Sequence, residues 1–192
     1  MGHSQLEKQK THDRIVEIAS KRLREKGLEG LGVADLMKEA GLTVGGFYKH
    51  FASRDEMVAE AMKLAFGSWE AKVRSEGRVP ADITMAEYSA SYLSPHHRED
   101  VSGGCPFAAL TADLARSGEK CRSLATDQLK ANLGNMAGRV AAADQAQARR
   151  KAIILSSLMT GAVGLARIVD DEELSNEILE TVRSFADDFA GK

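Results

Sequence analysis

The chain has 192 residues, of which 43% are hydrophobic and 28% are charged, and this composition is typical of a soluble globular protein. Its two cysteines, Cys105 and Cys121, are too few for a disulfide scaffold, and the polar segment 1–10 lacks the apolar core of a secretory signal. We therefore expect a cytoplasmic protein. Residues 1–55 hold ten of the 26 Lys and Arg residues but only eight of the 28 Asp and Glu residues. A slightly basic N-terminal part on an acidic remainder suits a protein that contacts phosphates at one end.

The first part of the chain predicts a series of short and long α-helices. Apolar positions at helical spacing predict a helix over 11–26, and Gly27 ends it. Shorter helices are predicted over 33–40 and 44–50. Ser53 and Glu56 then have the spacing of a capping box, which predicts the start of a long helix.

The remainder also reads as helical, because only three prolines occur in the whole chain. Helices are predicted over 83–93, from Cys105-Pro106 to Ser117-Gly118, and over 119–142, 146–168 and 171–190. Residues 95–104 are expected to form a polar, solvated loop, and Asp170 with Glu173 to cap the last helix. The apolar run 152–169 barely reaches the length of a membrane span and contains Arg167, so we expect a helix packed between other helices and no membrane partner.

The segment 33–51 carries the strongest functional signal. It reads VADLMKEAGLTVGGFYKHF, with a tight turn at Gly41 between two predicted helices and Thr43 at the start of the second. The second helix is short and contains Gly45 and Gly46, which permit close approach to a DNA groove. Hydrogen-bond donors for phosphates or base edges follow directly, and they are Tyr48, Lys49 and His50.

This segment resembles the TetR family of bacterial repressors. The matching residues are Ala40-Gly41-Leu42-Thr43, Gly46-Phe47-Tyr48, His50-Phe51 and Ser53-Arg54-Asp55-Glu56. The resemblance implies an all-α fold, with a helix-turn-helix DNA-binding domain over 1–53 and a helical effector-binding and dimerisation domain over 54–192. It also implies a homodimer that binds palindromic double-stranded DNA and responds to a small-molecule effector.

The resemblance also implies roles for individual residues. Thr43, Tyr48 and His50 match phosphate-contacting positions, and Arg54 resembles a lysine of the family that meets a phosphate. The full set of predicted DNA-binding residues is Thr43, Val44, Gly45, Gly46, Tyr48, Lys49, His50 and Arg54. Phe47 and Phe51 are expected to pack. Two departures stand out: Gly32 replaces a Ser or Thr that would supply a hydroxyl, and the Gly45-Gly46 pair leaves few side chains for base readout, so that DNA shape contributes to specificity.

The C-terminal part shows no nucleophile elbow, phosphate loop or metal-binding helix pair, so we expect no enzyme, no metal and no cofactor. His96 and His97 are adjacent in sequence, and adjacent side chains point in different directions, so we do not expect them to share a metal ion. An effector pocket is expected to be mostly apolar, and core packing is the alternative role for each candidate residue. The candidates are Met62, Phe66, Trp69, Tyr88, Tyr92, Phe107 and Leu110.

Cys105 is a candidate reactive thiol. Pro106 favours the first helical position, which puts Cys105 at the N-cap, where the helix dipole favours a thiolate. The Gly104-Cys105 pair also resembles a branch of the family that includes repressors of reactive electrophiles. The alternative is that a small residue is needed at this helix start. Cys121 is expected to be a buried structural thiol.

The last two helices are expected to form the dimer interface as half of a four-helix bundle, although they could instead only cap the core of one subunit. The predicted interface residues are Leu158, Ala162, Leu165, Leu174, Ile178, Val182 and Phe185.

Together these features predict a transcriptional repressor that a small molecule or an electrophile releases from a palindromic operator. Two other functions stay open at this point. One is a helical ligand-binding dimer without DNA affinity, and the other is a small helical enzyme.

Overall fold

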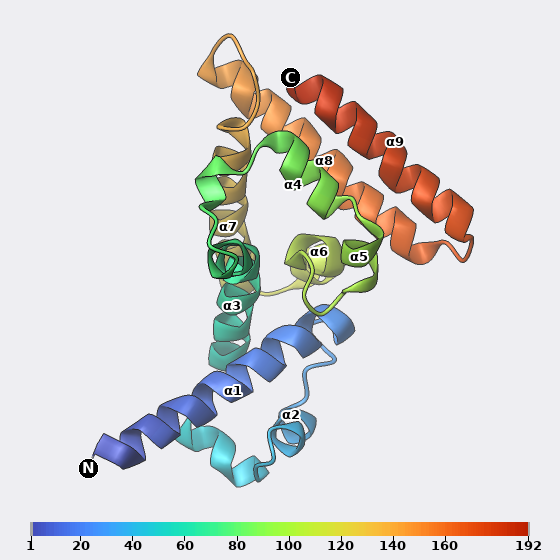
Figure 1. Ribbon diagram of the computed structural model, residues 1–192. Coiled ribbons are helices and arrows are strands. Elements are labelled where there is room, and N and C mark those ends of the chain that lie inside the picture. The colour runs from blue at the N-terminus through green and yellow to red at the C-terminus, as the bar shows by residue number, and fades with distance from the viewer. Residues whose placement is uncertain (1, 192) are drawn as a thin grey trace.

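A computed structural model describes residues 2–191 of the chain, and every regular element in that range is helical. We call residues 2–53 the head and residues 54–191 the body (Figure 1). The head contains α1 (Gly2–Lys26), α2 (Val33–Glu39) and the 3₁₀-helix η1 (Val44–Lys49). The body contains α3 (Arg54–Ser75), η2 (Pro80–Asp82), α4 (Met85–Tyr92), α5 (Pro95–Glu99), α6 (Pro106–Arg116), α7 (Glu119–Ala137), α8 (Gln145–Ile168) and α9 (Glu172–Ala190).

Glycines end two of the head helices. Gly27 follows α1 with φ +73° and Gly41 follows α2 with φ +69°, a region in which a side chain would be strained. The head is held together by side chains that are at most 1% exposed, namely Ile15, Leu23, Leu36, Phe47 and Phe51. Burial of each such side chain contributes about 2 kcal/mol.

The head core does not stop at the predicted boundary between residues 53 and 54. Met57 and Met62 of α3 belong to it, and so do Leu110 and Leu114 of α6. The first turns of α3 therefore pack with the head, while the same helix continues into the body. This continuity gives the head and the body a shared apolar contact.

A second core lies among the C-terminal helices. α8 and α9 pack side by side along one flank of the molecule, and α7 packs against α8 (Figure 1). By length and composition alone α8 is apolar enough to cross a membrane. Its residues Leu155, Met159 and Val163 are nevertheless at most 1% exposed and pack in this second core. The predicted packing of this helix between other helices is confirmed.

Several predicted elements differ in detail. α1 begins at Gly2 instead of 11, and α7 ends at Ala137 instead of 142. The predicted loop 95–104 is wrong in its first half, because Pro95 occupies the first turn of α5 and Ser94 accepts a hydrogen bond from the His97 N–H (3.1 Å).

Two predicted helix caps also differ. Asp171 caps α9, not Asp170, and it accepts from the Leu174 N–H (3.1 Å). Ser53 caps α3 as predicted, whereas the Glu56 carboxylate returns to the N–H of Ala52 (2.5 Å). Neighbouring polar residues compete for one cap, and backbone geometry decides between them.

Candidate DNA-binding surface and effector cavity

The predicted recognition segment forms an exposed edge of the head. Tyr48 is 74% exposed and Val44 is 51% exposed, and Thr43, Gly45 and Lys49 are also exposed. Phe47 and Phe51 are each 1% exposed and their ring centroids lie 5.2 Å apart. The predicted packing of these two phenylalanines is confirmed. Alternating buried and exposed positions therefore present polar and small residues on one outward surface.

The packing of the protein itself does not require the two glycines of η1. A Cβ atom added at Gly45 would meet no atom within 4 Å, and one at Gly46 would make only ordinary contacts with Met37 and Thr43 (3.6 and 3.8 Å). Neither glycine has a positive φ. Small side chains at an exposed position that the fold leaves open are what close approach to an external partner needs.

His50 is half-buried beside the N-terminal turns of α1. Its Nδ1 atom is buried and has no hydrogen-bond partner among the described residues. Burial, followed by the charges of His12 and Lys8, lowers the pKa of His50. A shallow groove formed by Glu7, Lys8, Thr11, Lys49 and His50 joins α1 to the recognition segment. Neither Lys8 nor Thr11 was predicted at this surface: Lys8 precedes the predicted start of the helix, and helical periodicity does not show that Thr11 faces the recognition segment.

Arg54 is exposed at the start of α3, and its guanidinium donates to backbone carbonyls of the head. Its Nε donates to the carbonyl of Leu31 (3.1 Å), and its Nη2 donates to the carbonyl of Leu28. These contacts fasten the connection between α1 and α2 to the start of α3. They give Arg54 a positioning role in the head, and its phosphate contact stays a prediction.

The body contains a cavity of about 170 Å³ among α3, α4, α5, α6, α7 and α8. Five of the seven predicted lining residues line it: Phe66, Trp69, Tyr88, Tyr92 and Phe107. The prediction is wrong for Met62 and Leu110. Both are 1% exposed and pack in the head core, because the faces of α3 and α6 on which they lie turn towards α1 and α2.

One wall of the cavity is aromatic. The rings of Phe66 and Phe107 lie 5.1 Å apart, and Trp69 meets the edge of Tyr88 at 5.2 Å. Tyr92 continues this wall and its hydroxyl lies 3.3 Å from the Thr160 hydroxyl. Burial raises the pKa of both tyrosines, which keeps their hydroxyls neutral at physiological pH.

The rest of the lining is mostly polar, and it includes the charged residues Glu70, Lys72, Asp100 and Arg139. It presents the carboxamides of Gln128, Asn132 and Asn135 from one face of α7 and hydroxyls from α8. Sequence analysis missed these amides, although their i, i+4, i+7 spacing on a helix was visible. Together the walls can hold a ring on one side and hydrogen-bond its polar substituents on the other.

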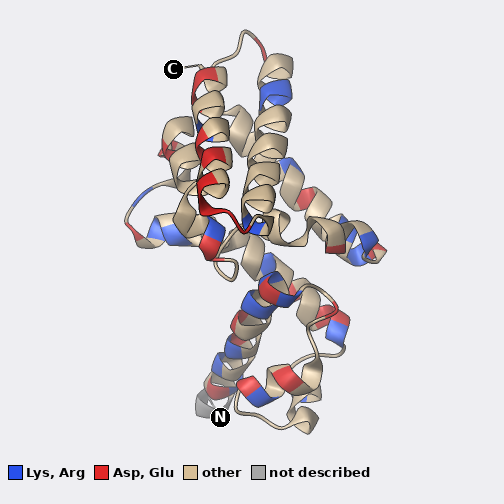
Figure 2. Ribbon diagram, turned by 90° about the vertical axis from the view of Figure 1, so that its right-hand side faces the viewer, with Lys and Arg blue, Asp and Glu red and all other residues tan. Residues whose placement is uncertain are grey.

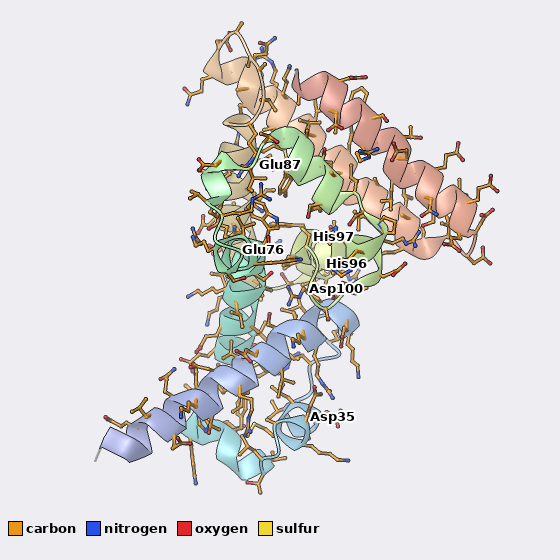
Figure 3. All side chains as sticks on the ribbon, viewed as in Figure 1. Asp35, Glu76, Glu87, His96, His97 and Asp100 are labelled. Atoms are coloured by element: carbon orange, nitrogen blue, oxygen red, sulfur yellow. The ribbon has the colours of Figure 1, made fainter. Side chains whose placement is uncertain are left out.

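Cys105 lies at the N-cap of α6, as predicted, and its thiol makes no capping hydrogen bond. It also lines the cavity, which was not predicted. Its backbone N–H donates to Nε2 of His97 (2.8 Å), while Nδ1 of His97 donates to the carbonyl of Tyr92 (2.6 Å). These two bonds require a neutral ring, and burial lowers the pKa of His97. His97 is thus an ordered, half-buried residue, so the predicted solvated loop is wrong here (Figure 3).

Cys121 packs against the head core, and burial raises the pKa of its thiol. This surrounding agrees with the structural role expected for Cys121. Within the described residues, no group of three His, Cys, Asp or Glu side chains is arranged to hold a metal ion.

The outer face of α8 and α9 carries an apolar surface. Leu158, Leu165, Leu174 and Phe185, four of the predicted interface residues, are 39%, 54%, 41% and 45% exposed. Ile178 and Val182 are half-buried against the second core. Ala162 is only 3% exposed, so its place in a dimer interface is corrected to a place in the core of one subunit.

The amino-acid sequence of the head is similar to that of known regulatory proteins. Residues 15–61 match the family model described as bacterial regulatory proteins, tetR family. The HTH-type transcriptional regulator PksA of Bacillus subtilis is 37% identical over 60 residues, which are 31% of this chain and 29% of PksA. The sequence match therefore spans less than a third of that relative.

Solved structures extend the likeness to the whole fold. A TetR family regulator from Cytophaga hutchinsonii has a TM-score of 0.77 at 19% identity, covering 97% of this chain and 98% of the other. FadR from Bacillus subtilis, solved with stearoyl-CoA, has a TM-score of 0.61 at 20% identity, covering 89% and 97%. Residues 15–61 thus match the tetR family of bacterial regulatory proteins, and the chain as a whole has the fold of these two solved regulators.

Proposed function

We propose that the protein is a homodimeric transcriptional repressor that binds a palindromic DNA operator and releases it when a small molecule occupies the body cavity. The observation that carries this proposal is the exposed recognition segment. Phe47 and Phe51 are buried and hold the segment against the head core, while Val44 and Tyr48 are exposed. The fold does not require glycine at positions 45 and 46. A DNA-binding repressor acts in the cytoplasm.

The apolar face of α8 and α9 supports the dimer. Leu158, Leu165 and Phe185 are large apolar side chains that one subunit leaves exposed, and a second copy of the same face covers them. Two-fold symmetry then presents two recognition segments to successive major grooves, about 34 Å apart. The operator is accordingly a palindrome.

The cavity supports the effector. Its aromatic wall and the amides and hydroxyls of α7 and α8 suit a small planar molecule with polar substituents, and Arg139 at the lining adds a positive charge near the aromatic wall. A volume of about 170 Å³ favours a ligand of one or two rings. Cys105 lines the same cavity and offers a second mode, in which an electrophile modifies its thiol.

Selection of DNA sites from random fragments, followed by affinity measurements on the selected site, tests the proposal. Tyr48→Ala and His50→Ala should weaken binding about tenfold for all sequences, because phosphate contacts carry no base information. Lys49→Ala should instead change the preferred sequence. Lys130→Ala is the matched control, since Lys130 is an exposed lysine on α7, outside the head.

Two results would contradict the proposal. Recovery of no preferred sequence would favour a ligand-binding dimer without DNA affinity. Wild-type affinity in all three head variants would show that the recognition segment is elsewhere.

A further inference from the structure

One peptide group at the cavity wall is hydrogen-bonded from two sides. The carbonyl of Gly104 accepts from Nη1 of Arg24 (3.2 Å), and the N–H of Cys105 donates to Nε2 of His97 (2.8 Å). Gly104, Cys105 and His97 all line the cavity. A ligand that displaces this peptide therefore changes both hydrogen bonds.

The two partners of the peptide belong to different parts of the molecule. Arg24 lies in the last turn of α1, in the head. His97 lies on α5, which Arg167 of α8 fastens to the body by donating to the carbonyls of His97 and Arg98 (2.9 Å each). In Figure 3, His97 and Asp100 lie between α8 and the end of α1. The peptide thus joins a fixed point of the body to the head.

Arg24 is poorly compensated where it lies. It is 6% exposed, its Nε is buried without a hydrogen-bond partner, and it forms no ion pair within the described residues, although the charges of Asp100 and Glu25 attract it at longer range. Its other contacts are long, at 3.3 Å to the Ser68 hydroxyl and 3.5 Å to the Ser20 hydroxyl. Burial also lowers the pKa of Arg24.

Such a placement is a poor device for stability alone. A buried cation that carboxylates compensate only at longer range costs free energy, and an apolar side chain of similar size often serves packing equally well. Ser68 also lines the cavity. Two of the groups that Arg24 contacts, the Ser68 hydroxyl and the Gly104 carbonyl, are therefore parts of the effector site.

We propose that Arg24 is a positioning residue that couples the effector cavity to the DNA-binding head through the Gly104–Cys105 peptide. This inference rests on the proposed function, regulated DNA binding. When the peptide moves, the hydrogen bond from Arg24 to the Gly104 carbonyl changes, and the end of α1 moves with it. The head then changes its spacing relative to that of the second subunit.

The Gly104→Ala substitution moves the peptide without any ligand. A Cβ atom at this position would lie 2.6 Å from the carbonyl oxygen of Asp100 and 2.9 Å from the ring of His97, so the peptide must shift. Gly118→Ala is the matched control, because a Cβ atom there meets nothing within 4 Å.

A double-mutant cycle on DNA affinity tests the coupling. We expect Gly104→Ala to change the dissociation constant for the selected DNA site about tenfold when Arg24 is present. In the Arg24→Met background the same substitution should change it less than about twofold. Arg24→Met alone should leave the thermal melting temperature within about 4 °C of wild type.

Three results would overturn the inference. Additive effects of Gly104→Ala and Arg24→Met on DNA affinity would show that Arg24 does not carry the coupling. So would an unchanged DNA affinity in Gly104→Ala. If Arg24 were purely structural, Arg24→Met would lower the melting temperature. It would also weaken DNA binding by the same factor whether residue 104 is Gly or Ala.

If the Gly104→Ala variant does not fold, a second substitution that moves the same peptide can replace it. His97→Leu releases the same peptide from its other side and enters the same cycle. If the unmodified protein binds no DNA, the proposed function fails first. If DNA binding is intact and the effects are additive, only the coupling role of Arg24 fails.

Discussion

The two cysteines show how position sets the chemistry of a residue. Both are free and half-buried. Cys105 lies at the wall of the cavity at the start of α6, where free backbone N–H groups favour negative charge. Cys121 packs against the head core, and burial, with a smaller effect from the charge of Asp55, raises the pKa of its thiol. Because the thiolate is the reacting form, Cys121 is the poorer nucleophile.

We therefore expect N-ethylmaleimide at neutral pH to label Cys105 several times faster than Cys121. Timed labelling followed by peptide mass mapping measures both rates in one sample, and Cys105→Ser and Cys121→Ser verify the assignment. Equal or faster labelling of Cys121 would remove the basis for a thiol sensor. A sensing role further requires that labelled protein loses DNA affinity and that Cys105→Ser keeps it.

Residue roles were predictable where a motif fixes them and less so where packing decides. The recognition motif predicted the burial of Phe47 and Phe51 correctly. For the cavity, helical periodicity identified apolar faces but not the neighbour that covers each face. Met62 and Leu110 are apolar and correctly placed along their helices, yet they face the head core. Arg24 carried no signal, because a lone arginine in an amphipathic helix is usually exposed.

At the scale of elements, α8 and α9 each serve two surfaces. One face of the pair fills the second core with Leu155, Met159 and Leu179, and the other leaves Leu158 and Leu165 exposed. A helix that packs on one face only would carry polar residues on the other. We therefore expect a second subunit to cover the apolar outer face.

Leu165→Glu should convert the dimer to a monomer. Leu165 is 54% exposed, so the carboxylate costs one subunit little but would be buried unpaired between two. Sedimentation velocity measures the change, and circular dichroism should show unchanged helix content. Leu129→Glu is the control, because Leu129 is a 38% exposed leucine on α7, outside this face.

Val182 is a poorer probe of the interface than Leu165. It is half-buried against the second core of its own subunit, so Val182→Asp would disturb the subunit together with the dimer. An intact dimer in Leu165→Glu would move the interface away from α8 and α9.

Element types were predictable from caps and periodicity, whereas element ends were predictable only where a glycine marks them. Gly27 and Gly41 ended their helices as predicted, because only glycine adopts a positive φ without strain. The recognition element forms a 3₁₀-helix, and its glycine pair explains why an α-helix is disfavoured there. α5 escaped notice because five residues are too few for a periodic pattern.

At the scale of the whole molecule, the head has a slight excess of basic residues and the body an excess of acidic residues. Figure 2 shows acidic residues along α9 and closely mixed acidic and basic residues on the head. An acidic body is repelled by phosphates, so only the head approaches DNA. The fold that places these parts was predictable from the motif and the helix count, but the cavity was not, because it depends on how six helices meet.

A rigid dimer should read the spacing of its two half-sites as strictly as their sequence. Five added base pairs turn one half-site about 180° away from the other, since B-DNA has about 10.5 base pairs per turn. We expect this insertion at the centre of the selected palindrome to weaken wild-type binding about a hundredfold or more, because only one head can then bind in register.

Leu165→Glu supplies the internal comparison for this spacing effect. As a monomer it should bind the original and the extended palindrome equally, each time with the weak affinity of one half-site. Electrophoretic mobility shifts report both affinity and the number of subunits bound. If wild type tolerated the insertion, the two heads would be joined flexibly or would bind independently. Release by a change in head spacing would then be excluded, because a dimer that does not sense the spacing of its DNA cannot lose affinity when its own spacing changes.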